Sequence, residues 1–429
     1  MSVGKYYLHN LGCKVNSYEA GAAAELLEAA GYEMTLSEEE ADIIIINTCT
    51  VTAVADKKSR QMLHRAKTAN PGAVVIAMGC YAEKEREDLL ADTAVDIIIG
   101  NNRKKDIVNI IKKYLEDREC SSWFADLGRG ASYEALSAKK PLEHTRAFVK
   151  IQDGCDSFCS YCIIPYVRGR IRSRDENDVL EEAERLADAG IQEIVLTGIH
   201  LSSYGKDKGK QGLLPLIEGL EQIEGIRRIR LGSLEAGIIT DEFAKSLLSS
   251  EKFCPHFHLS LQSGCSATLK RMNRHYTAEE YFEKCCILRT YFERPALTTD
   301  IIAGFPGETE EEFEESYEFV RKAGFFETHV FPYSRRKGTR AYDLPGQLTE
   351  AVKKERVRKL LELNDKKRAE YLDSGRGEPL EILFEEQDMI NGRLCWTGHT
   401  KRYEKAAYES GEDLKNHIVS VPYNEVIIL

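Results

Sequence analysis

The sequence has no apolar stretch long enough to cross a membrane. Its longest apolar runs, such as residues 43–46 and 73–78, fall far short of the ~20 residues that a transmembrane helix needs. Residues 1–10 lack the basic start and apolar centre of a signal peptide. These absences predict a cytoplasmic protein with no membrane association.

The chain also lacks an excess of basic residues. It has 59 Lys and Arg against 70 Asp and Glu, a net charge of −11. A general nucleic-acid coat protein would be basic, so any contact with nucleic acid must be local. The length of 429 residues and the 42% hydrophobic content predict two or three ordinary globular domains.

Cysteine, by contrast, is abundant, with twelve residues. Reducing conditions in the cytoplasm disfavour structural disulfides, so this number needs another explanation. Metal or cluster ligation is the leading one, but only for cysteines whose spacing supports it.

The fold class predicted from the pattern is α/β. Residues 1–120 alternate strands and helices, which indicates a doubly wound parallel sheet. The expected strands are 5–10, 43–47, 73–78 and 95–99, and the expected helices are 17–30 and 56–68. Residues 121–144 are irregular and are predicted to form a linker.

From residue 145 the alternation resumes and continues to residue 372. Its six strand candidates are 147–152, 193–197, 228–231, 256–261, 297–302 and 327–331. Six repeats predict a partial (βα)6 barrel, because a full eight-fold barrel needs ~250 residues. A long basic helix over 347–372 ends this domain, and residues 373–429 read as a small all-β domain.

Three cysteines in one loop form the strongest motif. Cys155, Cys159 and Cys162 have C-x3-C-x2-C spacing, and no further cysteine follows until Cys254. Three thiolates suit a [4Fe–4S] cluster whose fourth iron stays open for an exogenous ligand. The loop follows the first barrel strand, at the end of the barrel where chemistry occurs. A zinc site or free thiols is the alternative, although structural zinc prefers four protein ligands.

A second set of cysteines is dispersed in the sequence. Cys13, Cys49 and Cys80 each lie just past the end of a predicted parallel strand. These ends share one edge of a doubly wound sheet, so the three thiols are expected to converge on an auxiliary cluster. The alternative is three small buried residues at strand ends.

These segments carry a family resemblance. The loop 155–162 resembles the radical S-adenosylmethionine (SAM) superfamily. Residues 11–17, 47–51, 78–82 and 151–174 resemble the methylthiotransferases, and residues 397–400 lie in what looks like a TRAM domain, a small β-barrel that binds RNA. The match covers nearly the whole chain, and residues 14–16 most resemble the bacterial enzymes that act on N6-threonylcarbamoyladenosine in tRNA.

The resemblance implies two [4Fe–4S] clusters and SAM as cofactors. The cluster on Cys155, Cys159 and Cys162 would generate a 5′-deoxyadenosyl radical. The cluster on Cys13, Cys49 and Cys80 would carry the sulfur that is methylated and inserted at C2 of the base. A radical is a plausible means of activation, because an aromatic C2–H does not respond to acid–base chemistry; the cofactors then carry the hard chemistry.

The implied partners are the tRNA anticodon stem-loop, an electron donor such as a flavodoxin or ferredoxin, and a sulfur donor. Two enzymatic alternatives remain open: methylthiolation of isopentenyladenosine in tRNA, or of an aspartate in a ribosomal protein. A third alternative is a non-enzymatic iron–sulfur protein that binds RNA as a sensor.

Candidate SAM-binding residues lie mainly at strand ends of the barrel. Without the resemblance, only their position at a strand end supports this role, and the alternative is that they are ordinary turn residues. The superfamily resemblance adds a place near the adenine for the aromatic before the last cysteine. The candidates are Tyr161, Thr197, Gly198, Ser233, Glu235, Gln262 and Gly304.

Two groups of basic residues are candidates for RNA binding. Arginines at alternate positions would share one face of an extended segment and could bind phosphates. A solvated charged face is the alternative. The candidates are Arg168, Arg170, Arg172 and Arg174 in the first group and Arg335, Arg336 and Lys337 in the second. The remaining cysteines, Cys120, Cys254, Cys265, Cys285, Cys286 and Cys395, are assigned no role.

Overall fold

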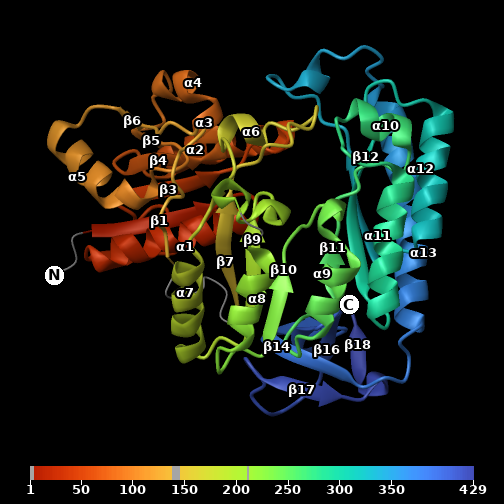
Figure 1. The fold of residues 1–429 in the computed structure, drawn as a ribbon. Helices are drawn as coiled ribbons and strands as arrows, with labels where there is room; N and C mark the ends of the chain where they lie inside the picture. The colour runs from red at the N-terminus through yellow and green to blue at the C-terminus, as the bar shows by residue number, and fades with distance from the viewer. Residues whose placement is uncertain (1–3, 138–144, 210–211) are drawn as a thin grey trace.

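The computed structural model describes residues 4–137, 145–209 and 212–429. It contains an N-terminal parallel sheet, a central half-open barrel and a C-terminal antiparallel sheet (Figure 1). Residues 138–144 of the predicted linker lie outside the described residues. Within the described ranges, no helix is both long enough and apolar enough to span a bilayer.

The N-terminal region confirms the doubly wound parallel sheet. Its strands, all parallel, follow the order β2-β1-β3-β4-β5-β6. They are β1 (Gly4–Asn10), β2 (Tyr32–Met34), β3 (Ile43–Thr48), β4 (Val74–Gly79), β5 (Ile97–Ile99) and β6 (Ser121–Trp123). The helices are α1 (Lys14–Ala29), α2 (Ala53–Ala69), α3 (Cys80–Lys84), α4 (Arg86–Leu90) and α5 (Ile107–Asp117).

The apolar run of β3 explains why this sheet is covered on both faces. Ile43 and Ile45 pack with residues of α1 and α5, whereas Ile44 and Ile46 pack with residues of α2. Successive strand side chains point to opposite faces, so a continuous apolar run is what a strand between two helical layers requires.

The linker prediction is wrong at its start. Residues 121–123 form β6, which pairs with β5 at the edge of the N-terminal sheet. The residues that follow are also held in place: Leu127 O accepts from Arg170 N at 3.1 Å, and Tyr133 Oη donates to Lys150 O at 2.8 Å. Short strands with polar residues such as Ser121 and Ser122 carry no hydrophobic periodicity, which is why the pattern missed them.

The central region confirms the partial barrel. Six parallel strands form two sheets, joined where β10 meets β11 by isolated bridges. The strands are β7 (Arg146–Asp153), β9 (Glu193–Gly198), β10 (Arg228–Leu231), β11 (His256–His258), β12 (Ala296–Ala303) and β13 (Glu327–Pro332), with β8 (Arg172–Ser173) antiparallel beside β7. The helices are α6 (Ile164–Val167), α7 (Glu176–Asp188), α8 (Leu213–Glu221), α9 (Asp241–Leu248), α10 (Ser266–Arg271), α11 (Ala278–Tyr291), α12 (Glu310–Ala323) and α13 (Glu350–Asp373).

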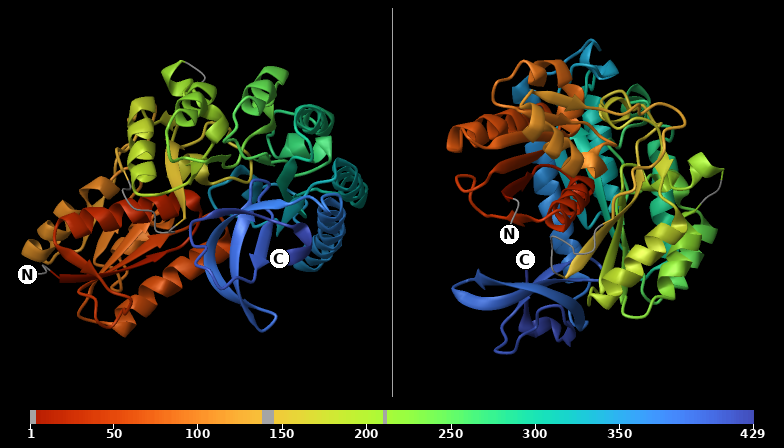
Figure 2. Two further views of the ribbon diagram at one scale, coloured as in Figure 1. Left: turned by 90° about the horizontal axis from the view of Figure 1, so that it is seen from below. Right: turned by 90° about the vertical axis from the view of Figure 1, so that its left-hand side faces the viewer.

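The C-terminal region is a curled antiparallel sheet of the kind expected for a TRAM-like barrel. Its order is β17-β14-β15-β16-β18. The strands are β14 (Leu380–Ile390), β15 (Arg393–Thr400), β16 (Lys405–Tyr408), β17 (Ile418–Val421) and β18 (Val426–Ile428). It docks beneath the barrel, at the N-terminal ends of the barrel strands (Figures 1 and 2). Arg146 pairs there with Glu385 at 3.1 Å, and Arg228 Nη1 donates to His399 O at 2.8 Å.

Candidate active site

The loop after β7 is shaped by its backbone. Gly154 has a φ of +71°, and a Cβ there would lie 1.9 Å from the Arg170 carbonyl oxygen. Only glycine lets the chain approach that closely. Cys155 N then donates to Gly169 O at 3.0 Å, and Phe158 takes up a left-handed φ of +46°. The loop is therefore pinned against the segment after α6, with its three cysteines on one short arc.

The three thiols of this loop influence one another. Burial, together with the nearby Cys159 and Cys155 thiols, raises the pKa of Cys162 to about 12. Two donors point at sulfur: Arg274 Nη1 lies 3.3 Å from Cys159 Sγ, and Ser157 N lies 3.4 Å from Cys155 Sγ. All three thiols are half-buried. A metal deprotonates and stabilises such thiols, so the donor set fits three ligands of an iron–sulfur cluster.

The N-terminal cysteines converge at the edge of the parallel sheet. Gly12 has a φ of +119°, and a Cβ there would lie 3.2 Å from Cys49 Cβ, so the loop before Cys13 touches Cys49. Gly79 has a φ of +98°, and a Cβ there would lie 2.7 Å from Asn47 Oδ1. Both glycines allow close packing of neighbouring strand ends, which brings the cysteines that follow them together.

Hydrogen bonds tie these strand ends into one unit. Asn16 Nδ2 donates to Leu11 O at 2.8 Å and to Thr48 O at 3.0 Å, and Thr48 Oγ1 donates to Met78 O at 2.6 Å. Burial, together with the Cys80 and Cys13 thiols, raises the pKa of Cys49 to about 11. The structure thus brings together the three cysteines that the sequence placed at strand ends.

One N-terminal cysteine lies at the boundary with the barrel domain. Cys80 packs against Ile163, which directly follows Cys162, and against Val167, the last residue of α6. Arg168 Nε donates to Cys80 Sγ at 3.1 Å. The barrel domain therefore closes one side of the N-terminal cysteine site.

All twelve cysteines lie in the described part of the chain, and each is a free thiol. Among the described residues, no three His, Cys, Asp or Glu side chains are grouped as ligands of a single metal ion. The thiolates of a four-iron cluster bind different irons, so they need not meet at one point. Both cysteine sets fit such a cluster in their donor type.

The predicted residues Thr197 and Gly198 end β9 beside the cysteine loop. A Cβ at Gly198 would lie 3.0 Å from Gln152 Cβ, so the two strands approach closely here. Gln152 Nε2 donates to Gly154 O at 2.7 Å, and Gln152 Oε1 accepts from His200 N at 2.7 Å. Gln152 therefore joins the cysteine loop to the loop after β9.

Glu235 is the most distinctive of the predicted SAM-binding residues. It pairs with His200 Nε2 at 3.0 Å and with Arg274 Nη2 at 3.1 Å. Although burial opposes ionisation, the hydrogen bond from His200 and the charge of Arg274 lower the pKa of Glu235 to about 2. Arg274 contacts both this ionised carboxylate and the Cys159 thiol. The carboxylate can accept hydrogen bonds from amino or hydroxyl groups.

The other predicted SAM-binding residues have varied surroundings. Ser233 is exposed, and Gln262 has a φ of +76° and links to β12 through its backbone. Tyr161 packs against the buried Met272, Phe305 and Tyr333, as a packing aromatic would.

The prediction for Gly304 needs correction. Its φ is +76°, but a Cβ there would lie 2.5 Å from Lys353 Cγ of α13. Its N–H donates to Glu308 Oε2 at 2.8 Å. The missing side chain makes room for Lys353 of α13.

The predicted row of RNA-binding arginines is wrong for three of its members. Arg168, Arg172 and Arg174 are buried, with at most 5% of each residue exposed. Arg174 Nη1 pairs with Glu182 at 2.6 Å, and Arg172 Nη1 donates to backbone carbonyls. Because β8 has only two residues, the segment is not the extended strand that alternation presupposed. Arg170 alone keeps substantial exposure, 35% of its side chain.

The second basic group is also divided. Arg336 is buried, donates to Thr50 Oγ1 at 2.7 Å and pairs with Asp56 at 3.1 Å, so it too is unavailable to phosphates. Arg335 and Lys337 are exposed. The buried member holds the barrel domain to the residue after Cys49.

Sequence reasoning missed several residues that surround the cysteines. They are Asn16, Gln152, His200 and Arg274. Each acts on a segment distant in sequence or through a backbone atom, so no spacing rule points to it. Asn16 and Gln152 lie in the segments 11–17 and 151–174 that resemble the methylthiotransferases, and this resemblance is the signal that could have indicated them.

The fold and the first cysteine loop define the class of protein. Residues 149–320 match the Radical SAM superfamily, and residues 5–100 match the uncharacterized protein family UPF0004. The chain is similar in fold to the radical SAM methyltransferase TsrM from Kitasatospora setae, with a TM-score of 0.57 at 15% identity, covering 80% of this chain and 77% of that one.

Curated relatives narrow the class. The chain is 42% identical to threonylcarbamoyladenosine tRNA methylthiotransferase MtaB of Bacillus subtilis, over 97% of this chain and 94% of that protein. It is 37% identical to tRNA-2-methylthio-N(6)-dimethylallyladenosine synthase of Pelotomaculum thermopropionicum, over 97% and 94%. The chain belongs to the radical SAM methylthiotransferase family.

Proposed function

We propose that this enzyme methylthiolates tRNA, converting N6-threonylcarbamoyladenosine next to the anticodon to its 2-methylthio derivative. The observation that carries the proposal is the contact of Cys80 with Ile163, Val167 and Arg168, just after Cys162. Two sites built from three cysteines each thereby adjoin one another. The names of the curated relatives support tRNA as the substrate.

In this proposal Cys155, Cys159 and Cys162 hold the radical SAM cluster, and Cys13, Cys49 and Cys80 hold the auxiliary cluster. When bound, the clusters and SAM supply the radical, the methyl group and the sulfur. The reaction also needs an electron donor such as a flavodoxin or ferredoxin, and a sulfur donor.

The chain itself supplies position and charge. Gln152 fixes the cysteine loop relative to His200, and Arg274 joins Cys159 to Glu235. The ionised Glu235 and the strand-end residues Thr197 and Gly198 are suited to bind and orient SAM beside the cluster. Cys49 and Cys80 are buried and Cys13 is exposed, so the auxiliary site is shielded from water on two sides and reaches the surface at Cys13.

The substrate is tested by mass analysis of tRNA nucleosides from a strain that lacks this gene. We expect the 2-methylthio derivative of threonylcarbamoyladenosine to disappear and the unmodified nucleoside to accumulate. Complementation with the wild-type chain must restore the derivative. Loss of the methylthio derivative of isopentenyladenosine alone would reject the substrate and favour the first alternative. Unchanged tRNA nucleosides would favour methylthiolation of the ribosomal-protein aspartate. Unchanged nucleosides together with no formation of 5′-deoxyadenosine from SAM would favour the non-enzymatic sensor.

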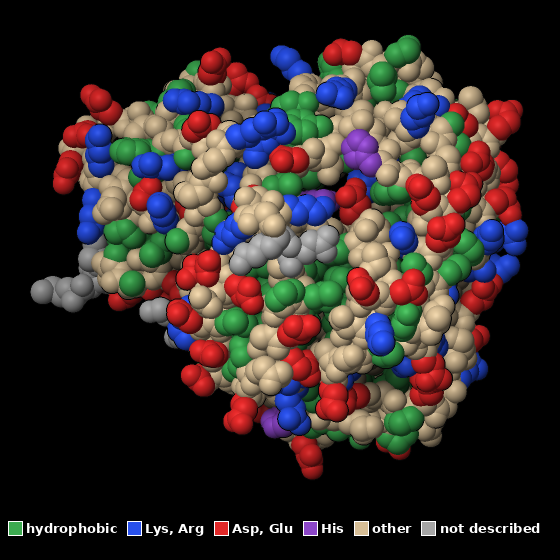
Figure 3. Space-filling model, in the orientation of Figure 1, with side chains coloured by type: hydrophobic (Ala, Val, Ile, Leu, Met, Phe, Trp, Pro, Cys, Tyr) green, Lys and Arg blue, Asp and Glu red, His purple; other side chains and the backbone are tan. Residues whose placement is uncertain are grey.

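We propose that tRNA lies over exposed basic and aromatic residues near the cysteine loop. Arg170 stacks on Phe158 at 4.5 Å, and Phe158 meets Tyr166, which is 50% exposed, at 5.7 Å. Arg335 stacks on Tyr342 at 4.3 Å. Unpaired RNA bases stack on aromatic rings and guanidinium planes. In the orientation of Figure 1, basic side chains lie beside hydrophobic ones in the upper part of the molecule (Figure 3).

Replacing Arg335 and Lys337 with glutamine is expected to weaken tRNA binding. Each phosphate contact that is lost should reduce the slope of log K against log salt by about 1, so the double variant should lose up to about 2. Filter binding at several salt concentrations measures the slope. Arg358→Gln is the matched control, because Arg358 is exposed but pairs with Glu355 and Glu362 on α13. An unchanged slope in the double variant would exclude this surface.

A further inference from the structure

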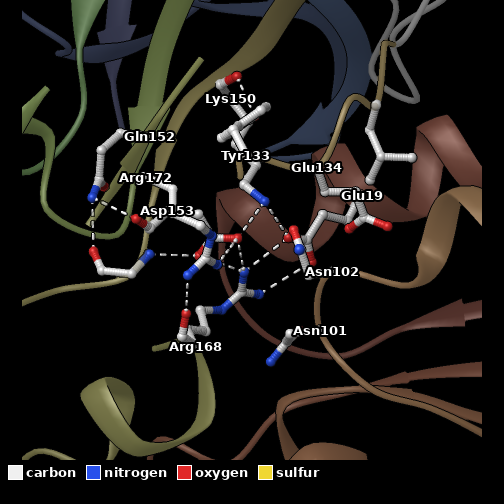
Figure 4. A network of polar contacts seen from close by, with 12 residues as sticks. Glu19, Asn101, Asn102, Tyr133, Glu134, Lys150, Gln152, Asp153, Arg168 and Arg172 are labelled. Atoms are coloured by element: carbon white, nitrogen blue, oxygen red, sulfur yellow. Dashed lines mark hydrogen bonds and ion pairs between the residues drawn. The ribbon is translucent and has the colours of Figure 1, made fainter. Parts of the chain in front are cut away.

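A buried ionic network joins the N-terminal sheet to the barrel (Figure 4). We call it the interface network. It consists of Glu19 of α1, Lys104, Lys150 and Asp153 of β7, Arg168 and Arg172, and each of these residues is at most 3% exposed. Glu19 pairs with Lys150 at 2.6 Å, Arg168 at 2.8 Å and Lys104 at 3.1 Å. The family function assigns none of these residues a task.

Among the residues of the interface network, only Arg168 donates a hydrogen bond to a cysteine sulfur. Its Nη1 contacts Glu19 at 2.8 Å and both oxygens of Asp153 at 3.2 Å, and its Nη2 donates to Asn16 Oδ1 at 2.8 Å. Its Nε donates to Cys80 Sγ at 3.1 Å. The guanidinium plane is therefore fixed from several sides, with one N–H left for the sulfur.

These partners belong to both cysteine sites. Asn16 binds the carbonyls of Leu11 and Thr48, which precede Cys13 and Cys49. Asp153 Oδ1 accepts from Gly154 N at 2.8 Å, directly before Cys155. A single side chain thus reaches Cys80, the strand ends of the N-terminal site and the base of the barrel loop.

The charges of the network favour an anion at Cys80. In the interface network, the two carboxylates of Glu19 and Asp153 form all the ion pairs of four cations. The cations are Lys104, Lys150, Arg168 and Arg172. Two further carboxylates nearby, Glu83 and Glu134, accept hydrogen bonds from backbone N–H groups of Asn101 and Lys105. A buried cation without full compensation is unfavourable, and a metal-bound thiolate would supply negative charge.

We propose that Arg168 is a positioning residue for the auxiliary cluster. Its Nε–H holds the Cys80 thiolate, and its Nη groups set that thiolate relative to the Cys155 loop through Glu19 and Asp153. Hydrogen bonds to cluster sulfurs are one of the factors that set a cluster's potential, and a donor stabilises the more negative, reduced state. Arg168 therefore raises the reduction potential of the auxiliary cluster. This inference rests on the proposed function, which assigns Cys80 to that cluster.

The test uses the full chain with Cys155, Cys159 and Cys162 replaced by alanine, so that only the auxiliary cluster can form. Into this parent are placed Arg168→Gln, Arg168→Lys and the matched control Arg174→Gln. Arg174 is also buried, and its Nη1 donates to Tyr18 Oη of α1 at 3.1 Å. Its other partners are Asp178 O and Glu182, and none of the three is a thiol. Iron content is measured after anaerobic reconstitution, and the potential by a redox titration followed by EPR.

We expect about four irons in the parent and in the control. Arg168→Gln should shift the redox equilibrium about tenfold toward the oxidised cluster, about 59 mV for one electron. Arg168→Lys should shift it less, because the charge remains while the planar fork is lost. Equal potentials in Arg168→Gln and Arg174→Gln would overturn the inference while leaving the cluster assignment intact.

Loss of iron has a different meaning in the parent and in the Arg168→Gln variant. A parent without iron would overturn the cluster assignment and, with it, the role of Arg168. If only Arg168→Gln fails to hold iron, the parent is instead labelled with 15N-arginine and its reduced cluster is studied by pulsed EPR. Modulation by arginine nitrogen supports the hydrogen bond to Cys80, and its absence overturns the inference.

Discussion

Replacing Cys13, Cys49 and Cys80 together with alanine will stop methylthiolation while 5′-deoxyadenosine still forms from SAM. The three thiols lie at the edge of the N-terminal sheet, whereas the radical SAM cysteines lie on a separate barrel loop with its own supports. Removing one set therefore leaves the other loop intact. Iron should fall from about eight to about four per chain. Anaerobic assays with reductant, SAM and tRNA measure both products by mass spectrometry.

Two controls make this result interpretable. Replacing Cys155, Cys159 and Cys162 should abolish both products, because SAM cleavage then fails as well. Replacing the exposed Cys120 and Cys286 should change neither product, since they belong to neither set. Sulfur delivery by the N-terminal triple variant would show that these cysteines hold no sulfur-carrying cluster.

The cysteine sites could be predicted because their positions follow from chain topology. In a parallel sheet, the residues just past the strands lie at the same edge, so Cys13, Cys49 and Cys80 could be expected to converge once the strands were recognised. The C-x3-C-x2-C spacing alone predicts the site in the loop of Cys155. Apolar runs such as 43–46 likewise revealed buried strands.

The arginines illustrate what the sequence did not reveal. The alternating Arg168, Arg170, Arg172 and Arg174 resemble an exposed strand, yet three of them are buried and paired with carboxylates, one of which comes from a distant segment. Glu19 lies 149 positions before Arg168, in a helix whose pattern gives no sign of a buried charge partner. A sequence pattern reports local periodicity, and it does not report which distant charge compensates a given side chain.

The same limit applies around the radical SAM loop. Arg274 reaches Cys159 and Glu235 from the segment after α10, and no spacing rule connects these three residues. Their contacts depend on how the barrel strands curve toward one another. Functional geometry of this kind becomes visible only when the tertiary structure is known.

Replacing Glu19 with glutamine will strongly destabilise the boundary between the N-terminal sheet and the barrel. Glu19 is fully buried and is paired with Lys104, Lys150 and Arg168. Removing one partner of a buried ion pair leaves uncompensated charge and typically costs about 3–5 kcal/mol. Urea unfolding of the cluster-free chain should show a lower midpoint for the first transition. Glu355→Gln, which removes an exposed partner of Arg358, should leave that midpoint unchanged.

The pH dependence of this effect gives a sharper test. Although burial opposes ionisation, Arg168, Lys104 and Lys150 hold the pKa of Glu19 well below its usual value. A carboxyl with a lowered folded-state pKa stabilises the protein fully above its unfolded pKa, about 4.3, and loses that contribution as the pH falls toward the folded pKa. The stability difference between wild type and Glu19→Gln should therefore be constant from pH 8 to about 5 and shrink below about 4. A difference that stays constant down to about pH 2 would show that Glu19 stabilises this boundary by packing and not by charge.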